Sequence, residues 1–178
     1  SEDPRGATAY VTLEPCSHYG RTPPCTKALI EAGIARVVIG VVDPDSKVKG
    51  TGIAQLRDAG IEITEGIHAE AIRRQLAPYL YHRTTGLPFC IGKCAISADG
   101  RIAAKDGSSQ WISSEAARRD AHQLRAESQA IVIGAGTALA DTTSLTLRPV
   151  EQQPLRPPLR AVIDAKGKVP ASGPLFKT

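Results

Sequence analysis

The stretch ARVVIGVVD, residues 35–43, decides the fold class of this chain of 178 residues. Its β-branched run is typical of a strand in a sheet that is buried on both faces. Segments with helical spacing flank it, TKALIEAGI at 26–34 with Gly33 as C-cap and GTGIAQLRDAG at 50–60. Strands that alternate with helices in this way predict an α/β fold whose sheet is covered by helices.

The same alternation extends in both directions from this stretch. ATAYVTLEP predicts a strand over 7–13 that ends at a proline turn, and IEITEG predicts a third strand over 61–66. Residues 69–86 predict a longer helix with a kink or break near Pro78, because proline cannot donate a helical hydrogen bond. The turn-rich TTGLPF at 84–89 indicates a domain boundary, which we place between domains 1–85 and 86–178.

The second domain repeats the α/β pattern with fewer elements. Its predicted elements are a strand within 90–104 that turns at Asp99–Gly100, a helix over 113–128 capped by Ser113 or Ser114, a buried strand and glycine loop over 129–141, and a strand at 159–169. Cys90 and Cys94 alternate along the first of these strands, and we expect them to be small buried residues rather than metal ligands.

Composition excludes several function classes. The net charge is +4 and the isoelectric point is near 9.0, but the basic residues are spread out and form no block with interleaved aromatics. We therefore expect no nucleic-acid partner. No apolar run approaches the roughly 20 residues of a membrane span, and the first residues resemble no signal peptide. The default location is the cytosol or an organelle matrix.

Two cysteines stand in LEPCSHYGRTPPC, residues 13–25, each preceded by proline. Cysteine thiolates in a reducing compartment are typical zinc ligands, and a catalytic zinc keeps one position open for water. Cys16 and Cys25 are therefore candidate ligands, and the alternative is two reduced cysteines in a loop. His68 and Glu70 lie in HAEA, but this motif follows the cysteines at a helix start, where we expect solvated side chains.

Long motifs of the chain resemble the family of bifunctional riboflavin-biosynthesis deaminase/reductases. The resemblance begins at YVTLEPCSHYGRTPPCTKALIEAGIARVVIGVVDP and continues through TGLPF, KCAISADGRIA, SSQWIS, RRDAHQLRAESQAIVIGAGTALAD and LRAVID. It implies the C-terminal part of a cytidine-deaminase-like three-layer α/β/α domain, followed by the first part of a dihydrofolate-reductase-like α/β domain. The implied activities are zinc-dependent deamination of a phosphoribosylamino-pyrimidine and NADPH-dependent reduction of its ribosyl group to ribityl.

For the deaminase half, the resemblance implies zinc held by Cys16, Cys25 and a histidine of a His-Ala-Glu motif that should precede Ser1. That motif would also supply the proton-shuttling glutamate, so this chain alone is expected to lack intact deaminase chemistry and to be a segment of a longer protein. His18 and Arg21 resemble family positions near the ribose phosphate of the substrate. A solvated loop arginine is the alternative for Arg21.

For the reductase half, the resemblance implies two sets of contacts with NADPH and substrate. The positions that match NADPH contacts are Ala95, Trp111, Thr137, Asp141 and Ala165, and those that match substrate contacts are Ser109, Arg125, Leu145 and Arg148. The family's later glycine-rich nucleotide loop should follow Thr178. Two arginines suit a bidentate phosphate clamp, and the one tryptophan could stack on a cofactor or pack as a wedge between elements. Lys93 and Asp99 could line the same cleft.

Alternatives to this bifunctional enzyme are a reductase-only protein with a degenerate deaminase half and a non-catalytic zinc- or nucleic-acid-binding module. The resemblance also implies a dimer or tetramer. It implies a location in the bacterial cytoplasm, or in the plastid stroma if the source is a plant.

Overall fold

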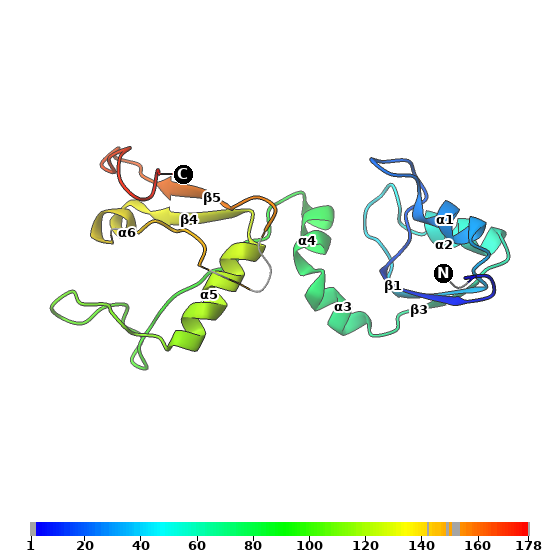
Figure 1. Ribbon diagram of the computed structural model, residues 1–178, viewed down its shortest axis with the longest axis horizontal. Helices are drawn as coiled ribbons and strands as arrows, with labels where there is room; N and C mark the ends of the chain where they lie inside the picture. The colour runs from blue at the N-terminus through cyan, green and yellow to red at the C-terminus, as the bar shows by residue number, and fades with distance from the viewer. Residues whose placement is uncertain (1–2, 142, 149, 151–153, 178) are drawn as a thin grey trace. The chain divides into compact units, whose positions relative to one another are not determined.

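The computed structural model describes residues 3–141, 143–148, 150 and 154–177. It divides into two compact units, Ser1–Ile91 and Gly92–Thr178, and Figure 1 labels the elements of each. The division lies a few residues past the boundary at 85/86 that the sequence predicted.

The first unit is built on a three-stranded parallel sheet in the order β1-β2-β3. Its elements are β1 (Thr8–Leu13), α1 (Cys25–Glu31), β2 (Arg36–Val41), α2 (Thr51–Asp58), β3 (Glu62–Glu65), α3 (Ala69–Gln75) and α4 (Ala77–Thr85). Helix α1 connects β1 to β2 and α2 connects β2 to β3, as parallel strands require crossover connections. The predicted strands and helices are confirmed, and the long helix is two helices, with the break falling just before Pro78.

The core of this unit lies on one face of β2. Val37 and Ile39 point to that face and are fully buried against Ile53 and Leu56 of α2. Residues alternate between faces along a strand, so Gly40 points to the opposite face. There Ile72 of α3 lies where a β-carbon on Gly40 would be. Helices therefore cover both faces of the sheet, which is the expected three-layer arrangement.

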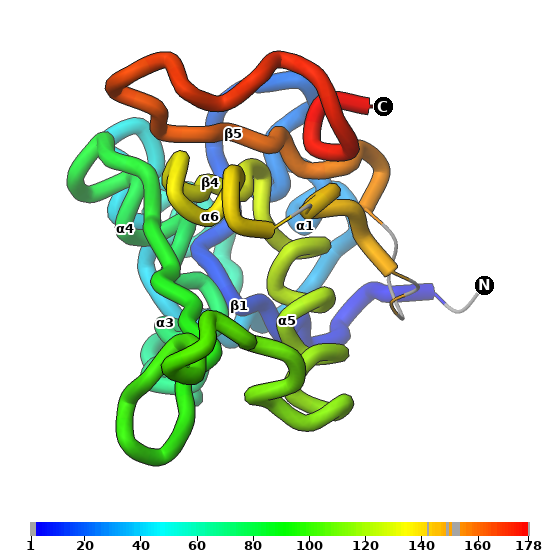
Figure 2. Tube along the Cα trace, turned by 90° about the vertical axis from the view of Figure 1, so that its left-hand side faces the viewer, coloured from blue at the N-terminus to red at the C-terminus, as the bar shows by residue number. Residues whose placement is uncertain are grey.

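The second unit contains a two-stranded parallel sheet. Its elements are α5 (Glu115–Glu127), β4 (Ala130–Gly134), α6 (Ala135–Ala140) and β5 (Leu159–Ile163). Strands β4 and β5 lie side by side, with Ala130 opposite Leu159 and Gly134 opposite Ile163, and Figure 2 shows the pair from the side. Ser114 caps α5 by accepting a hydrogen bond from the backbone of Ala117, which confirms that prediction.

Four expectations for residues 86–178 are wrong. No strand is assigned within 90–104, although the turn forms, with Ser97 and Arg101 hydrogen-bonded across it. Apolar alternation does not make a strand unless a neighbouring strand accepts its backbone hydrogen bonds, and no described segment does so. Cys90 and Cys94 are consequently exposed rather than buried.

The other two errors concern residues 129–141. Strand β4 is not buried on both faces, because its residues alternate between partly buried and exposed. The expected glycine loop after it is the short helix α6. Among the described residues, no helix combines the length and apolarity that crossing a membrane requires.

Candidate functional site

The two candidate zinc ligands lie next to each other in the first unit. Cys16 follows the end of β1, and Cys25 is the first residue of α1. The backbone N–H of Cys25 donates to Sγ of Cys16 across 3.4 Å. The pKa of the Cys25 thiol is raised, first by its hydrogen bond with Cys16, then by burial and by the charge on Cys16. A thiol whose pKa is raised by a neighbouring sulfur suits a cation that both sulfurs share, because the cation favours the thiolate form.

The cysteine pair is an incomplete metal site by itself. Within the part of the chain that the structure describes, no group of three or more His, Cys, Asp or Glu side chains could hold a metal ion. The sulfurs fit two positions of a tetrahedral zinc site, and further ligands are needed to complete it. His18 and Arg21 are exposed in the loop between the cysteines. His68 and Glu70 are exposed at the start of α3, where Glu70 pairs with Arg74.

A buried carboxylate beside Cys16 organises this loop, and the sequence analysis missed it. Glu14 is 3% exposed. Its Oε1 accepts hydrogen bonds from the backbone N–H groups of Gly52 and Ile53 at 3.0 and 3.2 Å. Its Oε2 accepts from Asp43 at 3.3 Å and from Gly50 at 3.0 Å. Glu14 therefore joins the end of β1 to the loop after β2 and to the start of α2.

Gly52 is required for this close approach. A β-carbon on Gly52 would lie 1.9 Å from the carbonyl oxygen of Pro15, so only glycine lets α2 come this close to the LEPC turn. Two further bonds hold the same turn, from Ser17 to Thr51 at 2.7 Å and from the hydroxyl of Thr26 to the carbonyl of Cys16 at 3.2 Å. The position of Cys16 is thus determined by α2 as well as by its own strand.

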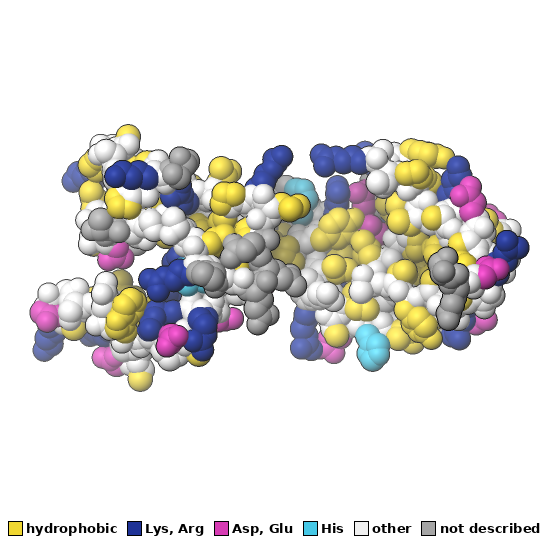
Figure 3. Space-filling model, in the orientation of Figure 1, with side chains coloured by type: hydrophobic (Ala, Val, Ile, Leu, Met, Phe, Trp, Pro, Cys, Tyr) yellow, Lys and Arg dark blue, Asp and Glu magenta, His cyan; other side chains and the backbone are white. Residues whose placement is uncertain are grey.

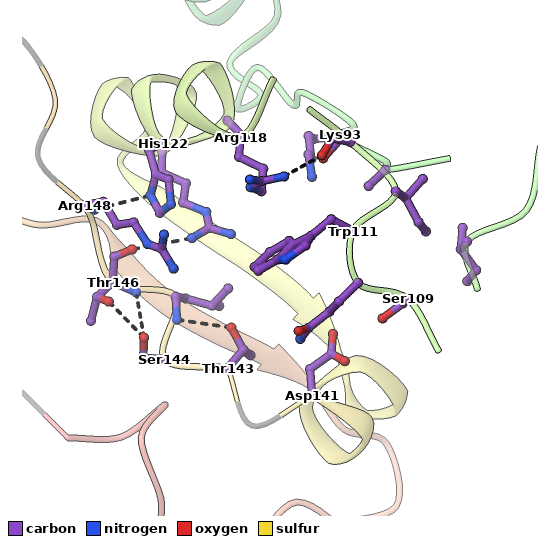
Figure 4. A pocket seen from close by; sticks show the side chains of 18 of the residues that line it. Lys93, Ser109, Trp111, Arg118, His122, Asp141, Thr143, Ser144, Thr146 and Arg148 are labelled. Atoms are coloured by element: carbon purple, nitrogen blue, oxygen red, sulfur yellow. Dashed lines mark hydrogen bonds between the residues drawn. The ribbon is translucent and has the colours of Figure 1, made fainter. Parts of the chain in front are cut away.

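The second unit contains a cavity of about 750 Å³. Seven of the nine residues expected to contact NADPH or substrate line it: Ala95, Ser109, Trp111, Arg125, Asp141, Leu145 and Arg148. Figure 3 shows this unit hollowed, with Lys and Arg side chains gathered beside the hollow, and Figure 4 shows the side chains that converge on the cavity. Thr137 in α6 and Ala165 after β5 are exposed and do not line the cavity.

The cavity is strongly cationic. Four lining residues carry a positive charge, Lys93, Arg118, Arg125 and Arg148, whereas Asp141 is the one carboxylate among the described lining residues. Burial lowers the pKa of Arg125, and the nearby charge of Arg148 lowers it further. Neither of these two arginines forms an ion pair within the described residues. Such unneutralised guanidinium groups suit a phosphate ligand.

Among the lining residues that the sequence analysis missed are two ionisable side chains of α5, Arg118 and His122. Arg118 lies with its guanidinium carbon 4.3 Å from the centre of the Trp111 ring, a cation–π contact, and also donates to the carbonyl of Ser113. His122 faces the cavity from α5 (Figure 4). The sequence could have identified both residues, because His122 and Arg118 stand three and seven residues before Arg125 and therefore lie on the same helix face.

Two family models match the chain. The model described as the RibD C-terminal domain matches residues 88–178. The model described as the cytidine and deoxycytidylate deaminase zinc-binding region matches residues 1–41.

Curated relatives match along nearly the whole chain. The riboflavin biosynthesis protein RibD of Chlamydia trachomatis is 48% identical over 172 residues, which are 96% of this chain and 46% of the relative. RibD of Escherichia coli is 47% identical over 178 residues, covering 94% of this chain and 48% of the relative. The chain thus spans about half the length of the curated relatives it matches.

Solved structures agree with these matches. The crystal structure of a diaminohydroxyphosphoribosylaminopyrimidine deaminase/5-amino-6-(5-phosphoribosylamino)uracil reductase from Thermotoga maritima superimposes with a TM-score of 0.90 at 41% identity. It covers 99% of this chain and 49% of that protein. RibD of Acinetobacter baumannii superimposes with a TM-score of 0.88 at 40% identity, covering 97% and 49% of the two chains.

Proposed function

Since this chain belongs to the RibD family, we propose that it contributes to riboflavin biosynthesis through two linked reactions. The first is hydrolytic deamination of 2,5-diamino-6-(5-phosphoribosylamino)pyrimidin-4-one, to which residues 1–85 belong. The second is NADPH-dependent reduction of the ribosyl group of the product to ribityl, to which residues 86–178 belong. The cationic cavity around Trp111 is the observation that carries this proposal, because it offers a ring face and paired guanidinium groups to a phosphorylated heterocycle.

In the reductase half, Arg125 and Arg148 bind the substrate phosphate through charge-assisted hydrogen bonds. Ser109 and Leu145, which both line the cavity, contact the rest of the substrate. Leu145 is buried, so its side chain excludes water from the bound heterocycle.

The cofactor contacts proposed for this half are Ala95, Trp111, Thr137, Asp141 and Ala165. NADPH supplies the hydride when it is bound. The indole of Trp111 offers a flat face to a ring of the cofactor, and Asp141 can accept a hydrogen bond from a hydroxyl group.

In the deaminase half, Cys16 and Cys25 hold the zinc ion, together with ligands beyond this pair. Bound zinc lowers the pKa of a water molecule toward neutrality. The bonds of Glu14 and Thr26 keep the Cys16 turn in place against α2. We assign His18 and Arg21, both exposed beside the cysteines, to the substrate phosphate in this half.

The proposal extends to the setting of the reaction. The curated relatives described above are bacterial, which supports a location of this protein in the cytoplasm. If the source is a plant, we expect a location in the plastid stroma. A homodimer or homotetramer remains a prediction from the family resemblance, as does the lack of a nucleic-acid partner.

Trp111 is the one tryptophan in the sequence, so its fluorescence reports ligand binding in the cavity. We expect 5-amino-6-(5-phosphoribosylamino)uracil to change this fluorescence saturably. Arg125→Ala should weaken binding about tenfold to a hundredfold, the cost of a lost charge-assisted bond. Arg119→Ala is the matched control, because Arg119 lies on the same helix but is exposed and paired with Glu115. Absence of binding by the unaltered protein, or equal losses in both variants, would contradict the proposed function.

A further inference from the structure

The segment from Thr143 to Arg148 lines the cavity, and no described strand pairs with it. Its backbone is held instead by two side chains of α5. Nδ1 of His122 accepts a hydrogen bond from the backbone N–H of Arg148 across 3.3 Å. Nη1 of Arg125 donates to the carbonyl oxygen of Thr146 across 3.4 Å.

These two contacts resemble a short length of β-ladder. They engage an N–H and a C=O two residues apart, as a neighbouring strand would. His122 and Arg125 are three residues apart and therefore share a helix face. On β5, Arg160 donates to the carbonyl of Ser144 across 3.1 Å and secures the other end of the segment. Within the described residues, the backbone of Arg148 at this end is held by the imidazole of His122.

The imidazole can accept this bond only while Nδ1 carries no proton. Burial lowers the pKa of His122, and the positive charges of Arg125 on its own helix and Arg148 on the facing segment lower it further. A neutral ring with its proton on Nε2 is thus favoured, and this tautomer presents Nδ1 as an acceptor. Figure 4 shows the ring between α5 and the Arg148 backbone.

We propose that His122 is a positioning residue for phosphate recognition, in which its neutral ring fixes the backbone of Arg148 and so aims that guanidinium at the ligand. The inference rests on the proposed function, since it takes the phosphate of the pyrimidine substrate as the group recognised. Because His122 acts through Arg148, its contribution should disappear when either the guanidinium or the phosphate is absent.

The test is a fluorescence titration of Trp111 with 5-amino-6-(5-phosphoribosylamino)uracil and with the same compound lacking its phosphate. His122→Ala should weaken binding of the phosphorylated compound about threefold to tenfold, the value of one hydrogen bond. Binding of the dephosphorylated compound should not change. His122→Asn should restore wild-type affinity, because Oδ1 of asparagine stands where Nδ1 stood and accepts the same bond.

A double-mutant cycle with Arg148→Ala separates positioning from a general structural role. In the Arg148→Ala background, His122→Ala should have no further effect on affinity. An equal loss in both backgrounds, an equal loss for both compounds, or failure of asparagine to restore affinity overturns the inference. If His122→Ala does not fold, His122→Asn with wild-type folding but weakened phosphate binding overturns it as well.

The same titration distinguishes failure of the proposed function from failure of the proposed role of His122. If the unaltered protein binds neither compound, the proposed function fails, and the role of His122 fails with it. If the unaltered protein binds, and Arg148→Ala weakens binding while His122→Ala does not, only the role of His122 is overturned.

Discussion

At the scale of the residue, Glu14 shows how a charged group can be structural beside a reactive pair. Its carboxylate is almost completely buried, yet four backbone N–H groups donate to it. Burial of an unpaired carboxylate would be very unfavourable, and these donors replace the lost water. The result is a rigid turn that presents Cys16 next to Cys25.

The chemistry of this cysteine pair can be tested by its metal content. Replacement of Cys16 by Ser removes a thiolate that zinc prefers to a hydroxyl group. In a polypeptide that also supplies the remaining ligands, we expect zinc to fall from about one ion per chain to near zero. Metal analysis of the purified protein measures this. Cys90→Ser is the control, because Cys90 is exposed and stands apart from the pair in the sequence. Equal zinc in both variants would rule out Cys16 as a ligand.

At the scale of the element, helices α2 and α6 contain glycines for different reasons. Gly52 in α2 lies against Pro15, with no room for a β-carbon. Gly136 in α6 has no heavy atom within 4 Å of the place where its β-carbon would lie. Glycine is otherwise unfavourable inside a helix, because it loses more backbone entropy on folding than alanine does.

The same substitution should therefore have opposite effects in these two helices. Gly52→Ala should lower the free energy of unfolding by about 1–3 kcal/mol or more through overpacking against the Pro15 carbonyl. Gly136→Ala should raise it by about 0.5–1 kcal/mol through helix propensity. Denaturant unfolding of the two variants measures both effects. A neutral Gly52→Ala would show that the turn can move away from α2, contrary to the close packing of Gly52 against Pro15.

Strands, helix breaks and caps were predictable from the sequence where nearby residues alone determine them. The strand at 36–41, the break before Pro78 and the cap at Ser114 each follow from residues within a few positions. The strand expected within 90–104 depended on a partner elsewhere, and α6 formed where the local glycines indicated a loop. Short apolar runs carry no information about which other segment lies beside them.

At the scale of the whole molecule, the buried apolar side chains are unevenly distributed. Of the eleven buried hydrophobic residues in the described chain, eight belong to the first unit. The three in the second unit are Ala126, Leu145 and Leu175, whereas Val132, Leu159 and Ile163 of its sheet are mostly exposed. Since apolar burial is the main favourable term in folding, the first unit should be the more stable.

We accordingly expect denaturant to unfold the chain in two steps. All four tyrosines lie in the first unit and the one tryptophan in the second, so tyrosine absorbance and tryptophan fluorescence follow the units separately. The tryptophan transition should come at the lower denaturant concentration. Leu56→Ala removes a fully buried side chain, so it should cost the first unit about 2–5 kcal/mol and shift the tyrosine transition alone. Coincident transitions for both probes would instead indicate one cooperative unit.

The sequence by itself determined the α/β class, the strands of the first unit, the cysteine pair and several of the cavity residues. Those properties follow from local periodicity and from motifs that lie within short stretches. The tertiary structure alone decided that Glu14 holds the backbone of α2, that His122 reaches the backbone of Arg148, and that Cys90 and Cys94 are exposed. Hydrogen-bond partners and burial are relations between distant segments, so they exist only once the chain has brought those segments together.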